Sequence, residues 1–277
     1  RLIVFDTTSK PEELKSTKLY RTFFHNRFVV VSALLSLSVI LVVFAIYSLF
    51  PFGDFTVLRM DLYHQYGPMF LEFYDRIIGH KSFLYTWNSG GSSFLGDYFN
   101  YLSSPLSFII FLFDREQIGD MITTLVIVKG VLSSVSFTYY LKASQKEHSY
   151  ISAVFGTIYA FSGYFLAYYW NIMWIDAMIL LPFIALGIER IIVKGNGKTY
   201  LTSLILLFFA SYYMGYMACI FSVVYFLVYY FAKNDITDRL SNNSNNIATK
   251  ILNVKFINRG LKFAFYSILS GMICACF

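Results

Sequence analysis

The feature that most constrains this chain is its first long apolar run, which extends from Phe28 to Phe50 without a charged residue. A helix needs ~20 apolar residues to cross the ~30 Å hydrocarbon core of a bilayer. Similar runs recur along the chain, and only 14% of its residues are charged, whereas soluble domains carry about 25%. Since a bilayer core cannot satisfy backbone polar groups, the sequence predicts an all-α fold, a polytopic transmembrane helix bundle.

The charges on either side of the first run predict its orientation. Residues 1–27 hold six basic and three acidic residues, so we expect a cytoplasmic N-terminal segment. The stretch 51–120 holds eight acidic and four basic residues, as is typical of the outer side. We therefore expect 51–119 to form a long first extracellular loop. The formal net charge of +6 sits in short loops between apolar runs, so it indicates the lipid bilayer as a partner and no nucleic acid.

Two segments of the predicted loop have structure of their own. Pro68 suits the first turn of a helix, and an apolar stripe follows at helical spacing, at Phe70, Phe73 and Ile77. These residues predict a helix that lies on the outer membrane surface, with Glu72 and Asp75 on its solvated face. The apolar stretch 104–113 is too short to span, and we expect it to be re-entrant or interfacial.

The remaining spans are assigned from the same alternation of sides. Three of them are expected at about 120–141, 150–169 and 172–193. Both flanks of 200–232 are basic, so we predict a hairpin of two short helices with its tip, Tyr212 to Tyr216, near the outer face and a bend at Gly215. The alternative is one long tilted helix, which would reverse every later segment. A cytoplasmic loop at 233–260 and a span beginning near Lys262 complete the transmembrane region, 28–277.

Several candidate groups then meet the outer boundary, namely Asp61, Asp97, Asp176 and the hairpin tip. Lys129 is different, because it lies near the middle of the second span, where ionisable groups usually mark a pair or a substrate path. Each group also has a structural explanation. Lys129 can form an ion pair or extend to the interface, and Asp176 can stabilise a helix N-terminus. Asp61 can be a solvated loop carboxylate or a helix cap, and the tyrosines can belong to an aromatic belt.

The motifs that carry these groups resemble the bacterial YfhO family. They read "RMDLYHQY", "TWNSGG", "DYFNYLSSPL", "VKG" around Lys129, "WIDAMILLPFIALGIERII" and "SYYMGYM". The resemblance runs from about residue 28 to the end. Such proteins are GT-C class membrane glycosyltransferases, longer than this chain, so we expect both ends to be cut and the C-terminus to be truncated. The resemblance implies a GT-C-like fold and transfer of a sugar from a polyprenyl-phosphate carrier to an extracellular cell-envelope acceptor such as teichoic acid.

The resemblance also implies site residues. GT-C enzymes place an essential Asp or Glu in the first extracellular loop, and Asp61 matches that position, so we expect it to be the catalytic base. We expect the substrate to contact Gln65, Tyr66, Trp87, Asn88, Asp97, Tyr101, Lys129, Trp174, Asp176, Tyr212, Tyr213 and Tyr216. No motif has metal-ligand spacing, but some GT-C enzymes use a divalent metal, so the cofactor stays open; Asp61 with Asp97 or Asp176 are then the candidate ligands.

Two functions from other classes remain open at this point. A lipid or sugar transporter, or a flippase, of the cytoplasmic membrane would also use an intramembrane lysine, aspartates and a broken helix. The acidic, aromatic-rich loop of 51–119 is large for a simple gate, which favours the transferase. A non-catalytic scaffold for envelope assembly is the third reading.

Overall fold

The computed structural model of the chain describes residues 26–85, 91, 93–147, 149–240 and 246–275. Within these ranges the secondary structure is helical apart from turns and one isolated bridge between Leu49 and Phe55, which confirms the all-α prediction. Five helices there are long and apolar enough to cross a membrane. They are α3 (Arg27–Ile46), α6 (Ile118–Ser144) with the short η4 before it, α7 (Tyr150–Ala160) with α8 (Gly163–Tyr168), α9 (Ile172–Lys194) and α11 (Tyr212–Leu240).

The remaining elements complete the bundle and the loop. A shorter apolar helix, α10 (Lys198–Ala210), precedes α11, and α12 (Asn246–Cys274) follows it. The segment between α3 and α6 forms only short elements. In chain order they are η1 (Leu62–Tyr66), α4 (Gly67–Ile78), α5 (Phe94–Asp97), η2 (Tyr98–Leu102), η3 (Pro105–Leu112) and η4 (Arg115–Gln117).

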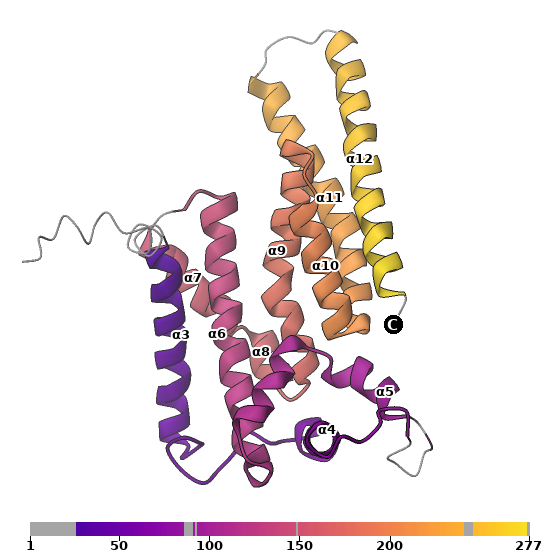
Figure 1. Ribbon diagram of the computed structural model, residues 1–277. Coiled ribbons are helices and arrows are strands. Elements are labelled where there is room, and N and C mark those ends of the chain that lie inside the picture. Colours follow the sequence, from indigo (N-terminus) through magenta and orange to yellow (C-terminus); the bar gives the residue numbers. More distant parts are fainter. Residues whose placement is uncertain (1–25, 86–90, 92, 148, 241–245, 276–277) are drawn as a thin grey trace, which may run out of the picture.

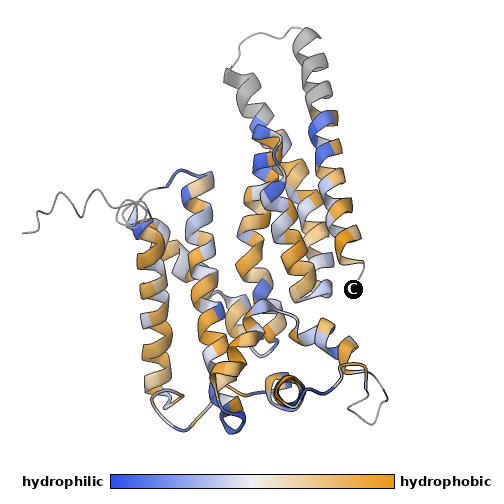
Figure 2. Cartoon of the chain, viewed as in Figure 1, coloured by the Kyte–Doolittle hydropathy of each residue, from blue (hydrophilic) through white to orange (hydrophobic). Residues whose placement is uncertain are grey.

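The long helices run side by side, and the loop elements gather at one end of them (Figure 1). The start of α3 and the ends of α6 and α9 point to the opposite end of the bundle. Apolar residues cover the helices along their length, while hydrophilic ones concentrate at the helix ends and in the loop (Figure 2). This alternation of ends matches the order of crossings that the loop charges predict.

Small residues bring the helices close together. A Cβ atom at Gly156 of α7 would collide with Thr138 and with the carbonyl of Ser134 on α6. A Cβ atom at Gly187 of α9 would collide with the backbone of Tyr200 on α10. Such small-residue contacts are the usual means of helix association in membranes, because lipid provides no hydrophobic drive between helices.

The structure differs from the predicted spans at two places. The expected span 150–169 is interrupted at Phe161 and Ser162, so α7 and α8 are separate helices. The hairpin in 200–232 is present, but the chain turns at Ser211, whose backbone is extended. The predicted tip, Tyr212 to Tyr216, forms the first turns of α11 instead.

Gly215 differs from the prediction, and the segment 233–260 has secondary structure of its own. Gly215 does not bend the chain; it lies within α11 and lets the ring of Phe208 approach, since a Cβ atom there would be 2.5 Å from that ring. Most of 233–260 is helical, because α11 continues to Leu240 and α12 already begins at Asn246.

The predicted surface helix exists as α4, which is viewed end-on in Figure 1 and so crosses the direction of the bundle. Its apolar stripe faces protein rather than lipid. Phe70 and Phe73 are buried, and Phe73 contacts the rings of Tyr98 and Phe111. Only Ile77 of the stripe is exposed.

The acidic residues of α4 are engaged rather than merely solvated, which corrects the expected solvated face. Glu72 accepts a hydrogen bond from the buried Arg76 at 2.7 Å. Asp75 accepts two hydrogen bonds from Arg115, at 2.6 and 2.8 Å, and this guanidinium holds the pKa of Asp75 below its usual value. The first pair lies within α4, whereas the pair with Arg115 connects α4 to η4.

Candidate functional site

A buried ion pair joins α6 to α9 inside the helix bundle. The Nζ of Lys129 lies 2.7 Å from Oδ2 of Asp176 and donates a second hydrogen bond, at 2.9 Å, to the carbonyl of Ile172. The exposed fractions of Lys129 and Asp176 are 1% and 4%. Because a charge inside a bilayer is costly, each group supplies the counter-ion that makes burial of the other tolerable.

Ser104 connects this pair to the loop. Its hydroxyl donates to Oδ1 of Asp176 at 2.9 Å and accepts from the amide of Leu106 at 3.3 Å. The serine therefore caps η3 and at the same time ties that helix to the buried pair. Sequence reasoning did not single out Ser104. The available signal was a serine directly before Pro105, which is typical of a helix start.

The loop also holds a buried phenol. Tyr66 is 1% exposed and lies edge-on to the ring of Tyr101, with 5.9 Å between ring centroids. Burial, and to a smaller extent the charges of Tyr101, Asp61 and Asp176, raises the pKa of Tyr66 well above its usual value. Tyr66 belongs to the same apolar core as Ile175 of α9, so η1 packs on the bundle.

Asp61 itself is exposed to solvent and stands directly before η1, without a side-chain hydrogen bond to cap that helix. The interpretation of Asp61 as a helix cap therefore has no support at η1, whereas its exposure agrees with the alternative of a solvated loop carboxylate. Gln65 is half-buried on η1. The exposed Arg59, which sequence reasoning also missed, places its guanidinium 5.4 Å from the ring centroid of Trp170.

An aromatic group occupies the same end of α9. The ring of Trp174 stacks on Tyr213 of α11, with 6.3 Å between centroids, and lies 5.5 Å from Tyr168 of α8. The indole Nε1 of Trp174 is buried and has no hydrogen-bond partner in the described part of the chain. A buried donor of this kind is available to an oxygen of a bound molecule. The tyrosines at 212 and 216 are exposed.

Other predicted residues are less directly connected with this group. Trp87 and Asn88 lie outside the described residues. Asp97 is the half-buried last residue of α5. Among the residues that the structure describes, no three His, Cys, Asp or Glu side chains gather closely enough to hold a metal ion.

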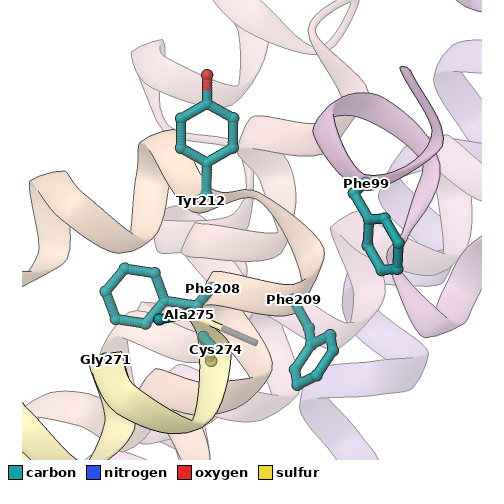
Figure 3. Close-up of a pocket in the computed structure, with 7 residues that line it drawn as sticks. All are labelled: Phe99, Phe208, Phe209, Tyr212, Gly271, Cys274 and Ala275. Carbon is teal, nitrogen blue, oxygen red and sulfur yellow. The ribbon is translucent and has the colours of Figure 1, made fainter. Parts of the chain in front are cut away.

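An apolar pocket of about 320 Å³ opens beside Tyr212, between η2, the turn from α10 to α11, and the end of α12 (Figure 3). Its size and its apolar lining suit a hydrocarbon chain. The lining residues are Phe99, Phe208, Phe209, Tyr212, Gly271, Cys274 and Ala275.

Comparison with known proteins gives one match. The family model described as "Bacterial membrane protein YfhO" matches residues 32–277. No curated protein and no solved structure matches the chain.

Proposed function

The chain belongs to the YfhO family of bacterial membrane proteins, and from this premise we propose that it is a membrane glycosyltransferase. It transfers a sugar from a polyprenyl-phosphate carrier to a cell-envelope acceptor such as teichoic acid, on the outer side of the cytoplasmic membrane. The N-terminus is cytoplasmic in this proposal, and the loop between α3 and α6 faces outside.

The observation that carries the proposal is the position of Asp61 at the edge of the buried core. Asp61 is exposed, so a polymer hydroxyl can reach it. It directly precedes η1, whose Tyr66 is buried in the same apolar core as Ile172 and Ile175 of α9. A reaction between a lipid-held donor and a water-borne acceptor needs such a boundary position. A carboxylate buried in the bundle would not meet the acceptor.

The proposed chemistry is a single displacement. Asp61 takes the proton of the acceptor hydroxyl while that oxygen bonds to the anomeric carbon, and the bond from this carbon to the phosphate oxygen breaks. The phosphate leaves on its lipid with both electrons of that bond. Arg59 is the cation best placed to hold it, because its exposed guanidinium lies over Trp170 and only two residues before Asp61.

The other predicted residues take supporting roles. The ammonium of Lys129 already donates hydrogen bonds to Asp176 and to the carbonyl of Ile172. We therefore propose that the ion pair positions the loop, through Ser104, and does not bind phosphate. Trp174 and Tyr213 offer stacked rings for a sugar face, and the apolar pocket beside Tyr212 offers room for part of the prenyl chain.

The test is a transfer assay with the full-length protein in vesicles that contain a polyprenyl-phosphate sugar. Asp61→Asn keeps the size of the side chain but removes the base, so transfer is expected to fall by about 10²–10⁴-fold. Asp54→Asn, on an exposed aspartate of the same loop, is the matched control and is expected to be near wild type. Equal rates for the two variants would refute the assignment of the base.

The same vesicles test the alternative function, transport. The interruption of the third span at Phe161 and Ser162 is the feature that favours it, since transporters use broken helices at their binding sites. A flippase would move the labelled lipid across the bilayer without forming a glycosylated product. That result would replace the transferase proposal.

A further inference from the structure

A second buried carboxylate lies in the bundle, about 20 Å along α9 from Asp176 at a rise of ~1.5 Å per residue. Glu189 is 5% exposed. Its Oε1 accepts hydrogen bonds from the hydroxyls of Tyr140, at 2.8 Å, and Tyr225, at 2.7 Å, while its Oε2 accepts one from Ser144. The two phenol oxygens are 3.1 Å apart. Oxygen atoms from α6, α9 and α11 thus gather around one carboxylate.

Within the described part of the chain, no basic residue forms an ion pair with this carboxylate. The ion pairs among the described residues are those of Glu72, Asp75 and Asp176, and none includes Glu189. Hydroxyl groups satisfy the lone pairs of the Glu189 carboxylate but do not neutralise its negative charge. A buried charge without a counter-ion costs several kcal/mol in a protein interior.

Three basic residues on the neighbouring helices have other contacts. Lys142 of α6 donates to Asn26 at 2.6 Å, and Arg190 of α9 donates to Thr199 at 2.7 Å. The Nζ of Lys233 on α11 lies over the ring of Tyr229, 5.8 Å from its centroid. The compensation that Lys129 provides for Asp176 is therefore not repeated at Glu189.

One helix end adds to the negative potential around Glu189. Ser144, which donates to its carboxylate, is the last residue of α6. The C-terminal end of a helix carries about half a negative charge from its aligned peptide dipoles, and the effect is confined to the last turn. The carboxylate and the end of α6 therefore both favour a positive ligand.

We propose that Glu189, Tyr140, Ser144 and Tyr225 form a binding site for a monovalent alkali cation, Na⁺ or K⁺. Carboxylate and hydroxyl oxygens are hard ligands, and each hydroxyl oxygen keeps lone pairs that it can turn toward an ion. One negative charge matches a monovalent ion, whereas Ca²⁺ sites usually gather several carboxylates. The ion enters at the end of α6, where the exposed Gln145 donates to the Ser144 hydroxyl at 3.0 Å.

The proposal is tested by thermal unfolding of the purified full-length protein in detergent. NaCl or KCl is titrated against choline chloride at constant ionic strength and pH. The unfolding midpoint of the wild type is expected to rise with Na⁺ or K⁺ and to saturate, and Glu189→Gln is expected to abolish the rise. Tyr140→Phe removes one ligand oxygen and is expected to raise the half-saturating concentration about five-fold or more.

Tyr139→Phe, next to Tyr140 on the same helix, is the matched control and is expected to keep the wild-type response. The two tyrosine variants decide the question even if Glu189→Gln does not fold. A midpoint that responds equally to choline, or equal responses of both tyrosine variants, would overturn the site. A midpoint that varies with pH but not with Na⁺ or K⁺ would also overturn it, because the carboxylate would then take up a proton instead.

Discussion

Removing the ammonium of Lys129 is the most direct test of how the loop is held on the bundle. Lys129→Met leaves a side chain of similar length but deletes two hydrogen bonds and the counter-ion of Asp176. Among the described residues, the hydroxyl of Ser104 would then be the one remaining partner of the carboxylate. Breaking a buried pair by removing one member typically costs ~3–5 kcal/mol, so we expect the free energy of unfolding to fall by about this amount.

The measurement is the unfolding equilibrium of the full-length protein in mixed micelles. Lys146→Met, on an exposed lysine just after α6, is the control and is expected to change the free energy of unfolding by less than ~0.5 kcal/mol. The double variant Lys129→Met/Asp176→Leu removes both charges and is expected to recover most of the loss. If Lys129→Met matches the control, or if the double variant is as unstable as the single one, the pair does not hold the loop.

Three further results are expected. Ser104→Ala removes a hydrogen bond to a buried charge and is expected to destabilise the protein by ~1–3 kcal/mol in the same unfolding assay, whereas Ser104→Thr, which keeps the hydroxyl, should cost less. Gly187→Ala forces α9 away from the backbone of α10 and is expected to cost ~1–3 kcal/mol, while Gly163→Ala, whose Cβ meets open space, should be neutral in that assay. In intact cells expressing a variant without its natural cysteines, an impermeant thiol reagent should label a cysteine placed at Glu116 but not one at Gln145; the reverse pattern would invert the topology.

Hydrophobicity alone specified most of the fold. A run such as that from Phe28 to Phe50 must be a helix in a bilayer, because no other local structure satisfies its backbone there. The basic flanks of 200–232 predicted a hairpin, and the structure contains one. The break between α7 and α8 was not predicted, since Phe161, Ser162 and Gly163 form only a short interruption in an otherwise apolar run.

Sequence reasoning singled out some residues of the candidate site but not their arrangement. The sequence placed Asp61 and Asp176 near the outer boundary and Lys129 in mid-span, and it left the partner of Lys129 open. Only the packing of α6 against α9 makes Asp176 that partner, and only the fold of the loop adds Ser104 to it. Such contacts join residues far apart in the chain, so no local pattern specifies them.

The same reason explains why Glu189 was not recognised. In the sequence it is one acidic residue beside Arg190 at the end of an apolar run, as expected of a helix end at the membrane surface. The tertiary structure buries it and surrounds it with hydroxyls from α6 and α11. Hydropathy and charge are properties of single residues, and they determine the number and order of the helices. Which charges are paired, and which are left to a ligand, depends on how the helices pack.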